Sequence, residues 1–249
     1  MVDSLITGGV DEFRERFMIV DLPGISDSAM TAVNALYTKY GQKYNNIADI
    51  PKTTLNDELM NNGFWKSTRY SMDARINAFM KNPVERYYAV KKVSGTRQVV
   101  GKEDFNKVQA AVNALKNSQC TSQYFSEPTP FDNIDKLYQL KFTANLNGVG
   151  YRCMADLLIV DYDKKLIIPV DLKTSMSCKE EDFYFNFLQW HYQLQARLYY
   201  RIIKDNLLRD DFFKDFTLLN YRFIIVNSES INPLVWEFSE TTEKGTLYY

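Results

Sequence analysis

Hydrophobic and polar positions alternate in the second half of the chain in a way that predicts strands. Residues 137–146 place apolar side chains at every second position, and Asn147-Gly148 follows as a strong two-residue hairpin signal. Residues 154–160 and 166–172 are mostly apolar and are separated by a short polar turn. We therefore predict the succession strand, turn, strand, turn, strand.

The rest of the chain is predicted from the same patterns. One long aromatic-rich helix is expected at residues 179–203, a strand at 217–226 and an edge strand at 234–238. In the first half, helical periodicity and capping signals predict helices at residues 26–40, 53–62, 67–80, 83–90 and 102–117. Loops are expected at residues 1–25 and 119–136, and an extended segment at 93–100.

These elements predict an α/β protein with a central mixed β-sheet flanked by helices and with a mainly helical N-terminal half. We expect residues 1–136 to form the helical part and residues 137–249 to form the core, packed together as one compact unit.

Two aspartates interrupt the second and third predicted strands of this core. If the turn is centred on Asp163-Lys164, an antiparallel register places Asp156 opposite Asp171. Two carboxylates so close on buried strands repel each other, and a hard divalent cation such as Mg²⁺, which prefers oxygen ligands, removes the conflict. Lys173 leaves the same face of the strand as Asp171, two residues earlier. The arrangement is typical of metal-assisted attack of water on a phosphodiester.

This ordered set resembles the PD-(D/E)xK nuclease superfamily, whose paired strands carry Asp and then Asp or Glu, any residue and Lys. The QxxxY spacing of Gln195 and Tyr199 is similar to the branch of recombination nucleases and phage exonucleases of the exonuclease VIII type. The segment Gly150-Tyr151-Arg152-Cys153-Met154-Ala155-Asp156 also resembles that branch, and the likeness covers roughly residues 137–204.

The resemblance implies a restriction-endonuclease-like core with a metal-dependent DNA nuclease site. Asp156, Asp171 and the backbone carbonyl of Leu172 would hold one or two Mg²⁺ or Mn²⁺ ions. Lys173 would orient or help activate the attacking water and neutralise charge on the phosphate, and Gln195 and Tyr199 would position Lys173 or the DNA. It further implies an exonuclease acting on duplex ends in phage-type recombination, with a single-strand annealing protein as partner and assembly into homo-oligomers.

Alternatives stay open at two levels. Each site residue could be structural: the aspartates as buried charges satisfied by hydrogen bonds, and the other residues as surface or interfacial polar groups. The whole protein could be a structure-specific endonuclease of the same fold, or an inactive DNA-binding or assembly protein. In the upstream helix, where this branch supplies a histidine or an acid, the chain has Asn77, a poorer ligand; Asp73 or Glu85 could substitute.

Positive charge is concentrated between Phe64 and Lys102, although the whole chain has a net charge of −1. That segment carries nine Lys/Arg and two acids, a local charge of +7. Concentrated positive charge suits a phosphate backbone, whereas a solvated helical face is the simpler explanation. The residues that we expect to contact DNA are Arg69, Arg75, Lys91, Lys92 and Arg97.

Composition excludes several classes. The 249 residues are 45% hydrophobic and 24% charged, as in an ordinary globular chain. Three cysteines without a CxxC spacing exclude the four-cysteine iron–sulfur cluster of some relatives, and the single histidine, His191, argues against His-rich zinc sites. An apolar run of membrane-spanning length and a signal peptide are lacking, so we expect a cytoplasmic protein, in the bacterial host cytoplasm if it is phage-encoded.

Overall fold

The computed structural model divides the chain into two compact units. It describes residues 1–21, 24–175, 180–207, 209–227, 231–238 and 246–248. Unit 1 comprises residues 1–10 and 106–249, and unit 2 comprises residues 11–105. The division expected at residue 136 coincides with neither boundary, because the first ten residues and residues 106–136 belong to the same unit as the sheet.

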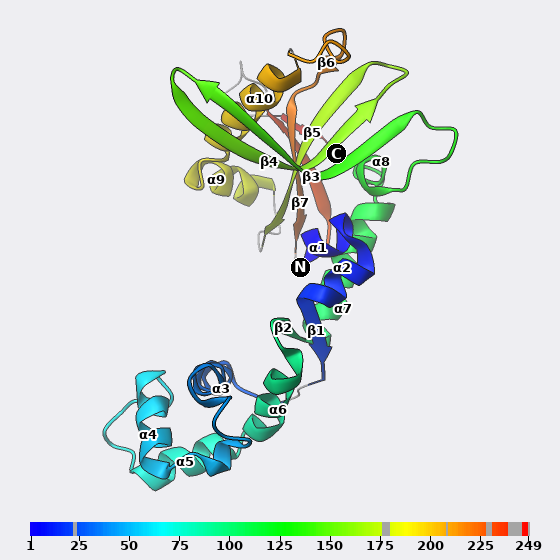
Figure 1. Cartoon of the computed structure of the whole chain (residues 1–249). Coiled ribbons are helices and arrows are strands. Elements are labelled where there is room, and N and C mark those ends of the chain that lie inside the picture. The colour runs from blue at the N-terminus through cyan, green and yellow to red at the C-terminus, as the bar shows by residue number, and fades with distance from the viewer. Residues whose placement is uncertain (22–23, 176–179, 208, 228–230, 239–245, 249) are drawn as a thin grey trace. The chain divides into compact units, whose positions relative to one another are not determined.

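Unit 1 is built on a seven-stranded mixed sheet in the order β3-β4-β5-β7-β8-β9, with β6 also paired to β5 (Figure 1). β5 runs parallel to β6 and β7, and the other pairs are antiparallel. β9 pairs outside β8, so the prediction that residues 234–238 form an edge strand is wrong. The strands are β3 (Ile134–Leu146), β4 (Val149–Asp161), β5 (Leu166–Ser175), β6 (Thr217–Leu218), β7 (Tyr221–Asn227), β8 (Pro233–Phe238) and β9 (Thr246–Tyr248).

Helices flank this sheet, which confirms the predicted fold class. They are α1 (Val2–Thr7), α7 (Lys102–Asn117, which crosses the unit boundary), α8 (Ser122–Phe125), α9 (Glu180–Gln189) and α10 (Tyr192–Leu207). α9 and α10 contribute Phe187 and Ile202 to a core that also contains Phe223 and Trp236 of the sheet. Each fully buried side chain of this size contributes roughly 1.5–3 kcal/mol. None of the helices in the described ranges is both long and apolar enough to cross a membrane.

The single helix predicted at residues 179–203 is wrong, because the chain turns at His191. Its φ of 54° is left-handed, a conformation that commonly ends helices. The described part of this segment therefore forms two helices rather than one. The break lets Phe187 pack against Trp236 at 5.7 Å between ring centroids, while Tyr192 stacks on Phe223 at 5.7 Å. Aromatic packing on the sheet decides the geometry here.

The two predicted hairpins are confirmed. β3 and β4 are joined by Asn147-Gly148, with φ values of 53° and 83°, as the tight hairpin turn requires. β4 and β5 are joined by the polar residues 162–165. Sequence reasoning placed these turns well because each depends on local residue types.

Unit 2 is mainly helical. Its elements are α2 (Gly9–Arg16, which crosses the boundary), β1 (Phe17–Val20), α3 (Asp27–Tyr40), the 3₁₀ turn η1 (Ile47–Asp49), α4 (Lys52–Asn61), α5 (Met72–Met80), α6 (Val84–Ser94) and β2 (Gln98–Gly101). Ser26 caps α3 as predicted, by accepting a hydrogen bond from the amide of Ala29. Three predictions are wrong: residues 1–25 hold two helices and a strand, the helix expected from residue 67 begins at Met72, and α6 extends into the segment expected to be extended.

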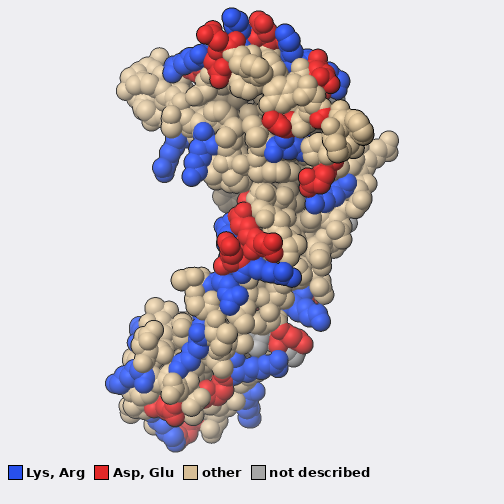
Figure 2. Space-filling model, turned by 45° about the vertical axis from the view of Figure 1, so that its right-hand side comes forward, with Lys and Arg blue, Asp and Glu red and all other residues tan. Residues whose placement is uncertain are grey.

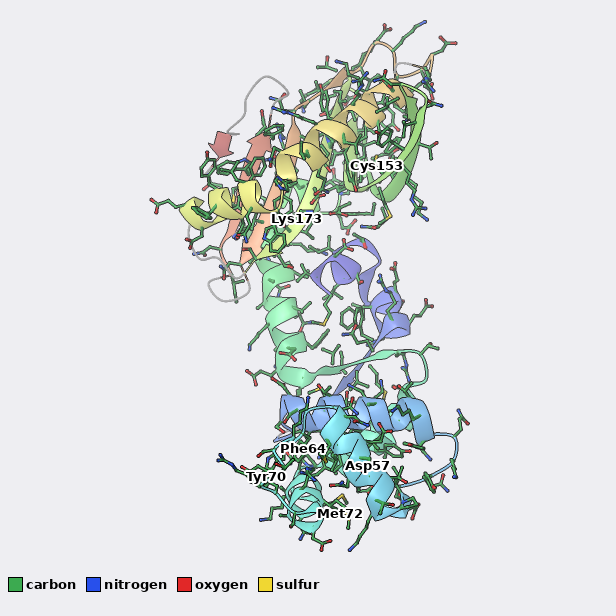
Figure 3. The ribbon with its side chains drawn as sticks, turned by 90° about the vertical axis from the view of Figure 1, so that its left-hand side faces the viewer. Asp57, Phe64, Tyr70, Met72, Cys153 and Lys173 are labelled. Atoms are coloured by element: carbon green, nitrogen blue, oxygen red, sulfur yellow. The ribbon has the colours of Figure 1, made fainter. Side chains whose placement is uncertain are left out.

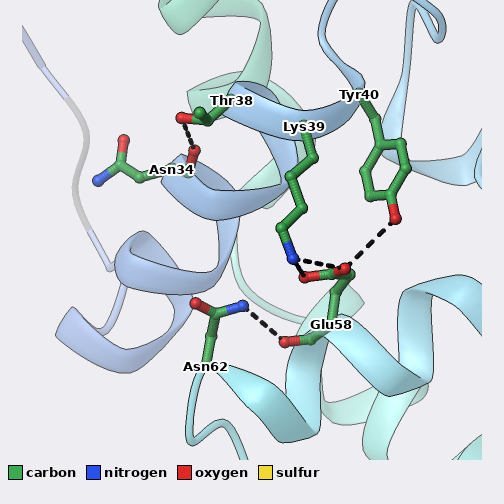
Figure 4. Close-up of polar contacts among 6 residues, drawn as sticks. All are labelled: Asn34, Thr38, Lys39, Tyr40, Glu58 and Asn62. Carbon is green, nitrogen blue, oxygen red and sulfur yellow. Dashed lines mark hydrogen bonds and ion pairs between the residues drawn. The ribbon is translucent and has the colours of Figure 1, made fainter.

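A buried carboxylate joins two helices of unit 2. Glu58 on α4 accepts hydrogen bonds from the Lys39 ammonium at 2.8 and 2.7 Å and from the Tyr40 hydroxyl at 3.3 Å (Figure 4). The Asn62 amide donates to the Glu58 carbonyl at 2.8 Å. The negative charge of Glu58 is therefore balanced by Lys39 within unit 2.

Candidate active site

The register of β4 and β5 brings the two predicted aspartates together. The pairs from Leu157↔Val170 to Asp161↔Leu166 follow the register inferred from the sequence. The next step of that register places Asp156 opposite Asp171. β5 then continues beside β7, where Asp171 pairs with Phe223. The strand carrying Asp171 is therefore an interior strand, which explains why its carboxylate is shielded from water.

Asp171 is only 2% exposed, although its side chain is ionisable and lies near a second acid, Asp156. The Gln195 amide of α10 donates to its Oδ1 at 2.5 Å, and the Lys173 ammonium forms an ion pair with its Oδ2. Burial raises the pKa of the Asp171 carboxyl to about 6; Lys173 lowers this pKa, and the charge of Asp156 raises it further. The fold thus holds an aspartate that resists ionisation unless more positive charge is supplied.

Lys173 is held in place from two sides. Its side chain is 21% exposed and extends from β5, where Figure 3 labels it. Because Lys173 follows Asp171 by two positions on this strand, both side chains leave the same face of the sheet. The ammonium lies 5.0 Å from the centroid of the Tyr192 ring and 5.8 Å from that of Phe223. Such cation–π contacts restrict a long flexible side chain. The ammonium is therefore fixed beside the carboxylates.

Asp156 is oriented by two hydrogen-bond donors that the sequence did not reveal. The backbone amide of Leu172 donates to its Oδ2 at 2.9 Å. The side-chain amide of Gln139 donates to its Oδ1 at 3.3 Å and also to Oδ1 of Asp3 at 3.2 Å. Gln139 therefore links the aspartate of β4 to helix α1.

Gln139 occupies a strained backbone position. Its φ is 51°, a left-handed value that non-glycine residues adopt rarely. The β3–β4 pairing skips it, because Tyr138 pairs with Leu157 and Leu140 with Ala155. Backbone strain of this kind costs about 1–3 kcal/mol and is common at functional sites. The strained residue is thus the one whose side-chain amide contacts Asp156.

Helix α1 packs beside Asp156 within unit 1. Asp3 and Ile6 of α1 line a small pocket together with Asp156 and Leu172. Sequence reasoning expected residues 1–25 to be a loop and thus missed Asp3. The repeat of apolar residues at Val2, Leu5 and Ile6, which are all buried, was the available signal.

Tyr199 lies near the site, but its hydroxyl makes no hydrogen bond to another residue within the described ranges. Its ring packs edge-on against Tyr221, with 6.3 Å between centroids. Burial, followed by the charge of Asp171, raises the pKa of Tyr199. Burial raises the pKa of Tyr221 well above its usual value, and nearby Asp171 adds to the effect. Both phenols therefore stay protonated and neutral beside the carboxylates.

The prediction that Arg75 contacts DNA is wrong. Its side chain is 2% exposed, and its guanidinium donates hydrogen bonds to three backbone carbonyls inside unit 2. Arg69 is exposed, Lys92 donates to Asn45 at 2.8 Å, and the guanidinium of Arg97 donates to the carbonyl of Ser94 at 3.3 Å. Lys91 lies 5.9 Å from the centroid of the Tyr37 ring. Figure 2 shows Lys and Arg side chains spread over the visible face of this unit.

The upstream residues considered as an extra metal ligand are Asp73, Asn77 and Glu85. Two of them, Asp73 and Glu85, interact with other residues of unit 2. Glu85 accepts hydrogen bonds from the amides of Ile47 and Ala48 at 2.9 and 2.8 Å, and so caps η1. Asp73 pairs with Lys52 at 3.6 Å, and Asn77 is exposed on α5.

The residues around Asp171 fit a hard divalent cation. Among the described residues, no three His, Cys, Asp or Glu side chains are arranged to hold a metal ion. The site nevertheless offers two carboxylates, and burial, with the charge of Asp156 added, raises the pKa of Asp171 even though Lys173 opposes the shift. Carboxylate and carbonyl oxygens are the ligands that Mg²⁺ prefers, usually one or two carboxylates completed by water and substrate.

Comparisons with known proteins add a distant likeness among solved structures. No family model matches the chain. No curated protein matches it either. Among solved structures, it is similar to the crystal structure of a protein from Eubacterium rectale named "Putative exonuclease", with a TM-score of 0.39 and 12% identity over 87% of this chain and 78% of that one. A TM-score of this size does not establish kinship, so Asp156, Asp171 and Lys173 have to carry any assignment of function.

Proposed function

We propose that the chain is a divalent-metal-dependent deoxyribonuclease, in particular an exonuclease that hydrolyses phosphodiester bonds at the ends of linear duplex DNA. The observation that carries the proposal is the Asp171 carboxylate, buried beside Asp156 with an ammonium and an amide turned to it. A buried carboxylate beside a second acid weakens a fold, so its presence indicates a function.

Asp156, Asp171 and the carbonyl of Leu172 would hold the ion, Mg²⁺ or Mn²⁺. When bound, it would polarise the attacking water and the phosphate and offset the repulsion between the aspartates. Gln195 keeps Asp171 oriented through Oδ1, and the Leu172 amide does the same for Asp156 through Oδ2. Side chains held in this way need little rearrangement before reaction.

Lys173 supplies the second source of positive charge. Its ammonium, fixed by Asp171 and by the Tyr192 ring, would hydrogen-bond to a phosphate oxygen and neutralise charge that develops as water attacks phosphorus and one P–O ester bond breaks. Tyr199, with its raised pKa, would act as a neutral group that shapes the site rather than as a base.

Gln139 and Asp3 extend the proposal beyond the residues read from the sequence. The Gln139 amide is shared between Asp156 and Asp3, so Asp3 orients the amide that orients Asp156. We assign both a positioning role. Phage-type recombination, an annealing-protein partner and homo-oligomers remain predictions from the resemblance.

Digestion of end-labelled linear duplex DNA, beside closed circular DNA, tests the proposal in Mg²⁺, Mn²⁺ or EDTA. The variants are Asp171→Asn and Lys173→Ala. Asp161→Asn is a matched control, because Asp161 is, like Asp171, a buried aspartate of the sheet, 7% exposed, but it lies at the far end of β4 and pairs with Lys164.

We expect metal-dependent loss of the linear DNA alone, abolished in the two site variants and retained in Asp161→Asn. Cutting of the circle would support the endonuclease alternative instead. If the folded parent chain cleaves neither DNA in either metal, the nuclease proposal is wrong. Thermal unfolding with and without Mg²⁺ gives a second readout: the ion should stabilise the parent but not Asp171→Asn.

A further inference from the structure

Two exposed aromatic rings stand together on unit 2, in the loop between α4 and α5. Trp65 is 43% exposed and Tyr70 is 44% exposed, and their ring centroids are 4.5 Å apart. We call them the aromatic pair. Large exposed aromatic side chains occur singly on most proteins, but a contacting pair on one loop is a feature that calls for an explanation.

The loop that carries the aromatic pair is fixed by a buried cation. The guanidinium of Arg75, 2% exposed, donates to the backbone carbonyls of Trp65 at 3.0 Å and of Ser67 and Tyr70 at 3.2 Å each. It also donates to the side-chain oxygen of Asn56. A charged group buried in this way locks the backbone at both ends of the loop. The backbone that carries the two exposed rings is therefore fixed at Trp65 and Tyr70.

Buried aromatic residues support the pair from below. Phe64 is buried and lies parallel to Trp65, with 6.2 Å between centroids and 8° between ring planes. It also packs edge-on against Phe79 at 5.2 Å. Figure 3 labels Phe64, Tyr70 and Met72 at this end of unit 2. Trp65 thus has a rigid support, which lowers the entropy lost when a ligand stacks on it.

Two cations flank the rings. Lys66 and Arg69 are exposed, and neither forms an ion pair with any residue in the described part of the chain. The nearby acid Asp73 is engaged by Lys52 at 3.6 Å, while Asp57 is exposed and accepts a hydrogen bond from Asn56. The balance around the pair is therefore positive, as a phosphate backbone requires.

Flat rings between cations match the chemistry of single-stranded nucleic acid. A base has a π-face that stacks on Trp or Tyr, and each nucleotide brings a phosphate for Lys or Arg. In the interior of duplex DNA the base faces are covered by their neighbours, whereas the bases of a single strand are free to stack on such a surface. A protein-binding hot spot would normally be depleted of lysine, unlike this loop.

We propose that Trp65 and Tyr70, flanked by Lys66 and Arg69, form a stacking site for an unpaired base of single-stranded DNA. This inference rests on the proposed function for the choice of DNA as ligand, and it adds a preference for a frayed or overhanging strand. It assigns Arg75 the task of holding the site rather than of touching the DNA.

Fluorescence anisotropy of the full chain in EDTA tests binding without cleavage. Labelled oligo(dT) is compared with an abasic oligomer of the same length, which keeps the phosphates but has no bases to stack. The variants are Trp65→Ala, Trp65→Phe, Tyr70→Ala and the double variant Lys66→Ala/Arg69→Ala. Phe131→Ala is the control, because Phe131 is an exposed aromatic residue of unit 1, 95% exposed.

We expect Trp65→Ala to weaken oligo(dT) binding about tenfold, while its binding to the abasic oligomer stays unchanged. Trp65→Phe should retain most of the affinity, because a smaller ring still stacks. The double variant should weaken both ligands and reduce the dependence on salt. Phe131→Ala should behave like the parent.

Equal affinity of folded Trp65→Ala and parent for oligo(dT) would overturn the proposal, and so would an equal loss on both oligomers. Circular dichroism checks the fold, and if Trp65→Ala unfolds, Tyr70→Ala decides by the same comparison of the two oligomers. Binding with the expected pattern in a chain that cleaves no DNA would reject the nuclease proposal and keep the stacking site. If the chain cleaves DNA but Trp65→Ala binds oligo(dT) as tightly as the parent, the stacking site is rejected and the nuclease proposal is kept.

Discussion

Two buried carboxylates, one in each unit, show how differently this chain uses the same chemical group. The Glu58 carboxylate accepts hydrogen bonds from Lys39 and Tyr40. The Lys39 ammonium also balances its negative charge. Asp171 also has a lysine partner and an amide donor, but it faces Asp156 as well. The first carboxylate is satisfied within the fold, and the second is not.

The difference separates a structural acid from a functional one. A buried acid paired with a cation and a hydroxyl ties helices together at little cost. A buried acid beside another acid is destabilising until an external cation arrives. Burial alone therefore does not identify a functional carboxylate; the sign of the neighbouring charges does.

Replacing Asp171 should give the largest effect. Asp171→Asn removes the charge that would hold the ion, and we expect cleavage of linear DNA to fall by about 10³-fold, equivalent to several kcal/mol of transition-state stabilisation. Initial rates on end-labelled duplex measure the loss. Retention of more than about a tenth of the activity would place the reaction elsewhere.

The pH dependence of stability should distinguish the two acids next. The pKa of Asp171 is raised to about 6, above that of the unfolded chain, so between about pH 4 and pH 6 the native state binds more protons. The free energy of unfolding should therefore fall as pH rises through this window, by up to about 3 kcal/mol. Urea unfolding in EDTA measures it, and Asp171→Asn should lack this fall while Glu58→Gln keeps it.

Gln139 tests whether backbone strain serves the site. Gln139→Gly relieves the positive φ and removes the amide shared by Asp156 and Asp3. We expect cleavage to drop about tenfold, as for other groups that orient ligands, without a loss in the free energy of unfolding. The Mg²⁺ concentration for half-maximal activity should also rise; a change in stability alone would reduce Gln139 to a structural role.

Glu58→Gln should have the smallest effect. The neutral amide keeps the shape of the side chain but weakens the bonds from Lys39 and Tyr40, and Lys39 is half-exposed. We expect the free energy of unfolding to fall by about 1 kcal/mol, with cleavage per folded molecule unchanged. An activity loss comparable to that of Asp171→Asn would erase the contrast between the two carboxylates.

Local patterns were enough to predict the part of the site on β4 and β5. The apolar strands, the polar turn at residues 162–165 and the Asn147-Gly148 hairpin fix the register that sets Asp156 opposite Asp171. Period-two alternation and turn chemistry act over a few residues, so a single sequence contains them. The same holds for α3 and α7, whose bounds follow capping and periodicity.

Features that depend on distant contacts could not be read in this way. The turn at His191 depends on aromatic packing against β7 and β8, and the left-handed Gln139 depends on a partner in α1. Arg75 looked like a DNA contact because charge in a sequence carries no record of burial. The division into units was missed for the same reason: the first ten residues join a sheet formed much later in the chain.

That last feature bears on how the protein folds. The bond between Asp3 and Gln139 joins residues 136 positions apart, with the whole of unit 2 between them. β1 and β2 pair in parallel and bring Val20 beside Gly101, so unit 2, once folded, closes most of that loop. Bypassing about 80 of these 136 residues through the pairing of Val20 with Gly101 saves roughly 1 kcal/mol of chain entropy. During synthesis, α1 emerges before β3 and β4 and has to wait for them, and early folding of unit 2 would shorten the search that completes the sheet.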